Sequence, residues 1–154
     1  MVEKVLDVGY IGQRINCCAH ASLAMVMNYN GVKVSQDEII ERLGVGYFGI
    51  SIGEMAKFSR EKGFDVAVSC DGLLKIINSI DNDFPVIVAQ QNSIVDKSVH
   101  YRVAVGYDDV KNKIIVHDPR DDGDFLCVSN NMFMSLWHSQ GFDCVALMLK
   151  GKSF

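Results

Sequence analysis

The chain has 154 residues, a formal net charge of −4 and 49% hydrophobic residues. These values suit a single globular domain over residues 1–154, and a domain of this size buries roughly 68–70% of its unfolded surface. The acidic balance without a dense Lys/Arg run argues against a nucleic-acid-binding protein, and no apolar stretch approaches the ~18 residues of a membrane span.

The first residues, Met1–Asp7, include acidic side chains and no apolar core of a secretory signal. The five cysteines are an odd number without zinc-type Cys-x-x-Cys spacing. This usage fits a reducing compartment better than a disulfide framework. We therefore expect a soluble, cytoplasmic protein.

A helix is predicted just after the polar stretch Gln13–Cys18. The following segment Ala19–Met27 is rich in Ala, Leu and Met, and Gly31 stands where a left-handed residue would end the helix. Asn16 is the expected N-cap. A thiol in the first turn of such a helix meets unpaired backbone N–H groups and the positive end of the helix dipole. This placement lowers a cysteine pKa from about 8.5 into roughly the 3.5–7.5 range.

The rest of the first half carries further helix-start signals. Ser35–Glu38 and Ser51–Glu54 each have the Ser-x-x-Glu spacing of a capping box. They predict helices that end near Gly44 and Gly63. A strand is expected at 66–68, followed by a fourth helix that Asp71 caps and that runs to Ile80.

The second half has the pattern of an antiparallel sheet, with turn residues between short apolar runs. Helices first and a sheet afterwards is the α+β class. The expected elements are strands at 85–89, 99–107, 113–117, 125–128 and 144–149, and a helical turn at 131–138 anchored by Trp137.

Two polar residues of this sheet are predicted to meet. His100 opens one strand and Asp118 ends the next, so a hairpin in which Tyr107 pairs with Lys111 places them opposite each other on one face. A register shifted by one residue would place them on opposite faces. The prediction therefore depends on the register of this hairpin.

These residues suit nucleophilic catalysis, in which a thiol is paired with a histidine that a third polar group orients. The Gln13 amide, five residues before Cys18, could fold back and bind an oxyanion together with the Cys18 backbone N–H. Each residue also has an ordinary interpretation: a buried core cysteine, a histidine at a strand edge, and an aspartate that forms a turn before Pro119.

Other candidates are weaker. His20 lies two residues after Cys18 and is expected to face away from it, and His117 should point to the opposite face of its strand from Asp118. Because no ligand cluster at zinc-like spacing accompanies Cys17, Cys18 and His20, and because the acidic run 121–124 is typical of an exposed loop, we predict no metal and no cofactor. The remaining cysteines, Cys70, Cys127 and Cys144, are interpreted as core residues.

A family resemblance extends over most of the chain. The first segment resembles the nucleophile motif of papain-like cysteine peptidases related to the bacteriocin leader-processing (double-glycine) peptidases, although Ala19 and His20 stand where that family usually has glycine and proline or alanine. The segments starting at His100 and Val116 resemble its second and third motifs, in the family order Cys, His, Asp. The residues that carry the first match are Gln13, Asn16, Cys18, Ala21, Ser22, Leu23, Ala24, Met25, Tyr29 and Gly31.

The resemblance implies a papain-like peptidase fold with the nucleophile at a helix start. It selects Cys18 rather than Cys17 as the nucleophile, with His100 as its base, Asp118 orienting His100, and Gln13 at the oxyanion. The implied function is a cysteine peptidase that cleaves a peptide or protein substrate through an acyl-enzyme, after small residues such as Gly-Gly. A papain-like acyltransferase and a catalytically silent peptide-binding domain are the alternatives, and no transporter or secretion partner can be named from the sequence.

Overall fold

The computed structural model describes residues 3–47, 49–120, 125–138 and 146–152. Within them the first half of the chain is mainly helical and the second half mainly strands, and the sheet pairings are all antiparallel. In chain order the elements are β1 (Glu3–Val5), α1 (Cys18–Tyr29), α2 (Gln36–Leu43), α3 (Ile52–Glu61), β2 (Phe64–Ser69), α4 (Leu73–Asp81), β3 (Val86–Gln91), β4 (Val99–Asp108), β5 (Lys113–His117), β6 (Leu126–Ser129), α5 (Asn130–His138) and β7 (Ala146–Lys152).

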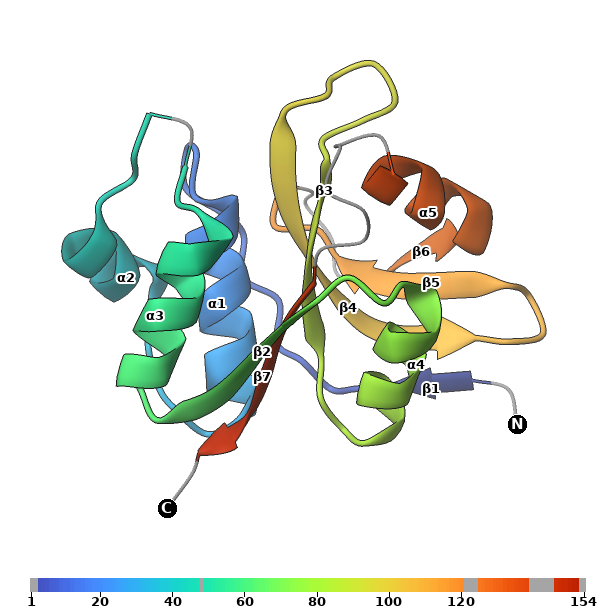
Figure 1. The fold of residues 1–154 in the computed structure, drawn as a ribbon, viewed down its shortest axis with the longest axis horizontal. Coiled ribbons are helices and arrows are strands. Elements are labelled where there is room, and N and C mark those ends of the chain that lie inside the picture. Colours follow the sequence, from blue (N-terminus) through green and yellow to red (C-terminus); the bar gives the residue numbers. More distant parts are fainter. Residues whose placement is uncertain (1–2, 48, 121–124, 139–145, 153–154) are drawn as a thin grey trace.

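The sheet has the strand order β2-β7-β3-β4-β5-β6, and β1 pairs with the end of β4. α1, α2 and α3 gather on one side of it (Figure 1). α5 lies against the other face. The Gln90 side chain of β3 donates to the Phe133 carbonyl of α5, whereas Val103, which pairs with a β3 residue three positions before Gln90, points toward α1. The α+β class and the papain-like fold are therefore as predicted.

The start of α1 differs from the prediction. Asn16 is not the N-cap: it has a φ of 60°, and Cys17 occupies the cap position. The reason is a tight turn in which the Cys17 N–H donates to the Arg14 carbonyl, because the third residue of such a turn takes a left-handed conformation that Asn tolerates. The helix then begins at Cys18, and Gly31, at a φ of 82°, follows its end as expected.

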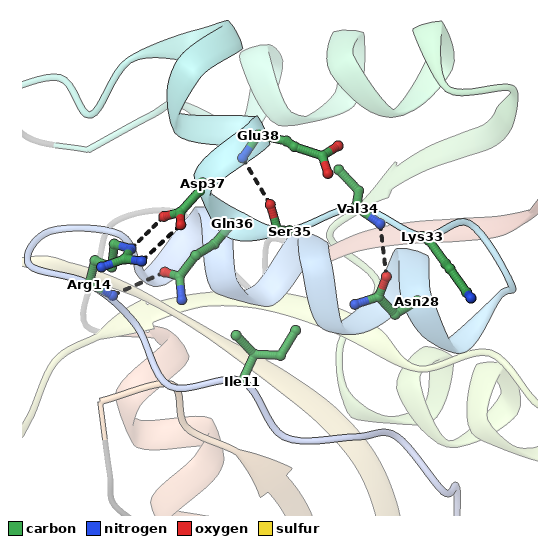
Figure 2. A pocket seen from close by; sticks show the side chains of 9 residues that line it. All are labelled: Ile11, Arg14, Asn28, Lys33, Val34, Ser35, Gln36, Asp37 and Glu38. Atoms are coloured by element: carbon green, nitrogen blue, oxygen red, sulfur yellow. Dashed lines mark hydrogen bonds and ion pairs between the residues drawn. The ribbon is translucent and has the colours of Figure 1, made fainter.

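Helices α2 and α3 start where the capping boxes predict. Ser35 accepts from the Glu38 N–H at the start of α2 (Figure 2), and at α3 both halves of the Ser51–Glu54 box are formed. The prediction that Asp71 caps α4 is wrong. Gly72 holds the cap position at a φ of 84°, and Asp71 instead bonds to the hydroxyl of Ser69.

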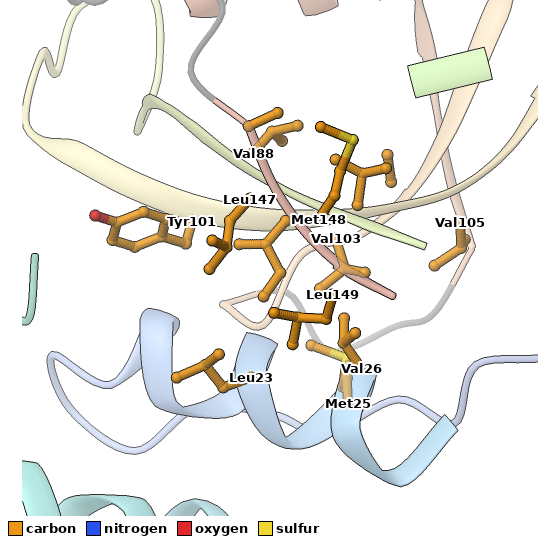
Figure 3. Packing of buried hydrophobic residues seen from close by; sticks show 14 of the residues in the cluster. Leu23, Met25, Val26, Val88, Tyr101, Val103, Val105, Leu147, Met148 and Leu149 are labelled. Carbon is orange, nitrogen blue, oxygen red and sulfur yellow. The ribbon is translucent and has the colours of Figure 1, made fainter. Parts of the chain in front are cut away.

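The core lies between α1 and the sheet. Leu23, Met25 and Val26 of α1 face strand side chains that include Val103 and Leu149 (Figure 3). Every residue of α1 from Ala19 to Met27 is buried, because the sheet covers one side of the helix and α2 and α3 the other. A helix that is buried all round needs no polar face, which explains why its sequence from Ala19 to Met27 is apolar apart from His20 and Ser22.

The β4–β5 hairpin has a different register from the predicted one. Tyr107 pairs with Ile114, not with Lys111, because residues 109–112 form the turn. A β-bulge between Ala104 and Gly106 then adds one residue to β4. At the turn, the observed register differs from the predicted one by three residues, and the bulge reduces the difference to two residues. Because two is an even number, His100 and Asp118 lie on the same face of the sheet, as predicted.

The remaining elements agree with the prediction wherever the structure describes them. Trp137 is fully buried at the end of α5 and packs edge-on against Phe133. The acidic run 121–124 and the start of the predicted last strand, residues 144–145, lie outside the described residues. In the described part of the chain, no helix has the length and apolarity needed to cross a bilayer.

Candidate active site

Cys18 is the first residue of α1 and is partly buried. Burial on its own raises the pKa of the thiol. A hydrogen bond from His100, the charge of that ring, and backbone hydrogen bonds from Tyr101 and Ala19 outweigh burial and lower the Cys18 pKa. The predicted effect of a helix start on this thiol thus acts through a definite donor, the Ala19 N–H, and is reinforced from β4.

His100 lies between the thiol and a carboxylate. Its Nε2 is 2.6 Å from Asp118 Oδ1, so Nδ1 is the ring nitrogen left for the Cys18 sulfur. Burial lowers the His100 pKa, but the hydrogen bonds to Asp118 and Cys18 and the Asp118 charge outweigh it and raise the pKa. A thiol whose pKa falls beside an imidazole whose pKa rises favours transfer of the proton from sulfur to nitrogen.

Asp118 is buried, and its three oxygen atoms all accept hydrogen bonds. Oδ1 accepts from His100 and from the Arg120 N–H at 3.0 Å, and Oδ2 accepts from Arg102 at 2.8 Å. Its backbone carbonyl accepts from the Tyr10 hydroxyl at 2.9 Å. Burial raises the pKa of this carboxyl, yet His100, Arg102 and Arg120 lower it to about 2. Asp118 is therefore an ionised and immobile acceptor for His100.

Arg102 is the residue of this site that sequence reasoning missed. It lies two residues after His100 on β4, on the same face, and its side chain is buried. Besides Asp118 it binds the Gln91 carbonyl, the Asn92 carbonyl and the Gln90 amide oxygen. The available signal was an arginine inside an otherwise apolar strand, since a buried charge requires a partner.

A cavity of about 360 Å³ opens beside the thiol, and Gln13, Cys18 and His100 all line it. The structure therefore brings the predicted glutamine to the same space as the thiol and the imidazole. The Gln13 Nε2 makes a long hydrogen bond of 3.4 Å to the Arg14 carbonyl. Its Oε1 is buried and meets no donor among the described residues.

The neighbouring cysteine has the opposite environment. Cys17 is almost fully buried, its thiol donates to the Ile15 carbonyl, and burial raises its pKa. Only Cys18 of this pair has an activated thiol. The interpretation of Cys70 and Cys127 as core residues is wrong, because both are exposed, Cys70 just after β2 and Cys127 within β6. Cys144 lies outside the described residues.

The other two histidines of known environment hold the backbone. His117 Nε2 donates to the Val8 carbonyl at 2.6 Å and Nδ1 accepts from the Phe125 N–H, so the neutral ring uses both nitrogens. His20 contacts the Gly44 carbonyl at 2.8 Å. His20 was expected to face away from the thiol, and His117 was expected to point to the opposite face of its strand from Asp118. Among the described residues, no group of three or more His, Cys, Asp or Glu side chains is placed to hold a metal ion.

Comparison with known proteins identifies the family of the chain. The sequence model of the family described as Peptidase_C39-like matches residues 5–145, which is most of the chain. The chain belongs to the Peptidase_C39-like family. A search of curated proteins gives no significant match.

Solved structures share the fold of this C39-like chain at low sequence identity. A C39-like peptidase from Bacillus anthracis has a TM-score of 0.80 at 16% identity, covering 98% of this chain and 99% of the other. The peptidase domain of Streptococcus ComA, a bifunctional ABC transporter of a quorum-sensing pathway, has 0.72 at 22%, with 92% and 97% covered. A double-glycine-motif protease from an AMS/PCAT transporter, solved with its leader peptide, has 0.70 at 19%, with 96% and 94% covered.

Proposed function

We propose that this C39-like chain is a cysteine peptidase with Cys18 as nucleophile, His100 as acid and base, and Asp118 as the group that orients His100. The observation that carries the proposal is the position of the His100 ring, which hydrogen-bonds to the Cys18 thiol and to the Asp118 carboxylate at once. Such a base-and-orienter arrangement activates a nucleophile near neutral pH.

The reaction proceeds in two halves. The Cys18 thiolate forms a bond to the scissile carbonyl carbon, the C–N bond breaks, and the His100 imidazolium gives its proton to the leaving amine. His100 then takes a proton from water, the resulting hydroxide attacks the thioester, and the C–S bond breaks. The products are a free carboxylic acid and the regenerated thiolate.

The oxyanion of each half-reaction binds the Cys18 backbone N–H and the Gln13 side-chain amide. A half-turn of the Gln13 amide exchanges Nε2 and Oε1. It gives up the long 3.4 Å bond to the Arg14 carbonyl and turns Oε1 toward that carbonyl oxygen. It places an N–H at the buried position where Oε1 now meets no donor among the described residues. Loss of one oxyanion donor typically lowers kcat about 10²- to 10³-fold.

We propose peptides cleaved after small residues, such as Gly-Gly, as the substrate class. Support comes from the family and from the protease named for its double-glycine motif and solved with a leader peptide. Because the ComA domain is part of an ABC transporter, a transporter or secretion system is the proposed partner, acting as the source or destination of the peptide.

The first test compares Cys18 alkylation with peptide cleavage. At pH 6 a mild thiol reagent should label Cys18 much faster than the exposed Cys70 and Cys127, and His100→Ala should remove this difference. Peptides with a central Gly-Gly should then be cleaved by the native protein and not by Cys18→Ala. Matched peptides with Leu-Leu test the small-residue preference.

The same assays separate the alternatives. Added hydroxylamine or glycine amide competes with water for the thioester, so a product consisting only of the amide or hydroxamate would indicate an acyltransferase. Ordinary Cys18 labelling without cleavage of any peptide would indicate a silent binding domain. Cleavage by Cys18→Ala at the native rate would overturn the mechanism.

A further inference from the structure

The segment that carries Gln13 is held by the first turn of α2, on the side away from the cavity of Cys18. The Gln36 side chain donates from Nε2 to the Gly12 carbonyl at 2.7 Å, and its Oε1 accepts from the Arg14 N–H at 3.0 Å. A single amide thus binds the peptide units on both sides of Gln13. This double contact fixes the backbone from which the Gln13 side chain extends.

A second contact sets the direction of the same segment. The Arg14 guanidinium forms a two-pronged ion pair with the Asp37 carboxylate, with Nη2 to Oδ2 at 2.8 Å (Figure 2). This pair is exposed, so it contributes little to the stability of the fold. Its two parallel contacts nevertheless restrict the orientation of the Arg14 side chain relative to α2. Together with Gln36, it ties residues 12–14 to α2 by side chains that follow directly on the Ser35 cap.

The opposite side of the segment is tied to the turn of the catalytic aspartate. The Gln13 backbone N–H donates to the Pro119 carbonyl at 2.8 Å, and Pro119 follows Asp118. Gln13 therefore lies between two anchors, one on α2 and one at the end of β5. Gln36 does not line the cavity that contains Cys18 and His100, so its contacts reach the reaction only through this segment.

We propose that Gln36 is a positioning residue that sets the Gln13 amide at the oxyanion. The proposal rests on the oxyanion role proposed for Gln13. An oxyanion donor acts only within hydrogen-bond distance of the developing charge, and a displacement of about 1 Å can lower the rate about 10²-fold. Gln36 removes the freedom of residues 12–14 that would allow such a displacement.

The test is Gln36→Leu, which keeps the size of the side chain and removes both hydrogen bonds. We expect kcat for a peptide substrate to fall about tenfold with KM unchanged, as for an interaction made only in the transition state. The pH dependence of Cys18 alkylation should stay that of the native protein, because the thiol and His100 are untouched. In a Gln13→Ala background, Gln36→Leu should cause no further loss.

Ser35→Ala is the matched control. It removes the cap of the same helix turn at a cost of about 1 kcal/mol of stability, but leaves both Gln36 contacts in place. We expect native kcat from this variant. An equal loss in Ser35→Ala and Gln36→Leu, a native kcat in Gln36→Leu, or a further loss in the Gln13→Ala background would each overturn the proposal.

A measurement without substrate separates this proposal from the peptidase proposal. The side-chain amide signals of Gln13, assigned by their loss in Gln13→Ala, should shift or broaden in Gln36→Leu and stay unchanged in Ser35→Ala. Unchanged signals in Gln36→Leu would overturn the positioning role, whatever the activity. Native cleavage by Cys18→Ala would overturn the peptidase mechanism and leave this result standing.

Discussion

Arg102 donates to Asp118 Oδ2 at 2.8 Å, on the same carboxylate whose Oδ1 binds His100 at 2.6 Å. His100 is therefore oriented by one half of an ion pair rather than by an isolated anion. The Arg102 charge opposes the rise that Asp118 causes in the pKa of His100. An imidazolium that is less strongly stabilised gives up its proton more readily, as the proposed leaving-group step requires.

Replacement of Arg102 by Met should move the basic limb of the pH–activity profile upward. Without the nearby cation the His100 pKa rises further, so the imidazolium persists to a higher pH. Turnover should fall about tenfold at the optimum, because Asp118 loses the contact that fixes its plane. The measurement is kcat/KM for a cleaved peptide between pH 5 and 10, a range chosen to span both limbs.

Two further variants control this experiment. Arg102→Lys keeps the positive charge but loses the planar guanidinium that binds several acceptors at once. It should lower turnover and change the basic limb of the pH–activity profile little. Arg60→Met removes the same side chain from an exposed position of α3 and should change neither quantity. A basic limb that does not move in Arg102→Met would contradict the electrostatic role of Arg102.

Asp118→Asn should reduce the loss of stability in acid. The folded-state pKa of Asp118 is about 2, below the ordinary 3.8, so its charge stabilises the fold above pH 3.8. This contribution, on the order of 2 kcal/mol, disappears as the pH falls through the folded-state value. His100 is protonated in both states in this range and adds no slope.

Urea unfolding at pH 5 and pH 2.5 measures this effect. Asp96, whose pKa is also about 2, contributes an acid slope in the native protein and in the variant alike. The informative quantity is therefore the difference between them, which should be large at pH 5 and small at pH 2.5. A difference independent of pH would mean that Asp118 stabilises the fold by packing alone.

His100 and His117 lie on adjacent strands, and we expect their replacement to have opposite effects on stability and on Cys18 labelling. His117→Phe leaves the Val8 carbonyl and the Phe125 N–H without their buried partner, which should cost about 1–3 kcal/mol per group. Cys18 labelling at pH 6 should stay fast. His100→Ala should slow that labelling strongly and change the urea midpoint less. The reverse pattern would exchange the roles of the two residues.

Gly106→Ala should destabilise the fold through the β1–β4 contact. A Cβ at this position would lie 2.5 Å from the Lys4 carbonyl oxygen, so β1 would have to move away. We expect a loss of about 1–3 kcal/mol, the usual cost of overpacking. Gly53→Ala is the control, since the nearest atom to its Cβ is the Ser51 hydroxyl at 3.8 Å, and it should unfold at the native midpoint or above.

The features that the sequence predicted are those set by local chemistry. Ser51 and Glu54 lie three residues apart, and both bonds of their capping box form. Gly31 ends α1 because its left-handed φ depends on the residue itself. The helix start at Cys18 was predicted too, although with the wrong cap, because the Arg14–Cys17 turn competes for the conformation of Asn16.

The features that the sequence did not predict depend on contacts between residues that lie far apart in the chain. The bulge in β4 lies where the Leu6 N–H donates to the Val105 carbonyl, a contact that a local reading of β4 does not contain. Arg102 was missed because its partners come from β3, from the following loop and from Asp118. The proximity of His100 and Asp118 was predicted from a wrong register. The predicted and the observed registers differ by an even number of residues, and this odd–even relation places both side chains on one face in either case.

That odd–even relation restricts how the β4–β5 hairpin can change in length. Removal of one residue from β5, with the Asp108–Lys113 pair and the bulge kept, would turn Asp118 to the face now occupied by His117. Removal of two residues would return Asp118 to its present face, but two positions further along β4 from His100. Changes in the length of β5 are therefore compatible with a shared face only in pairs, whereas the turn at 109–112 can gain or lose single residues without changing the pairing of the strands.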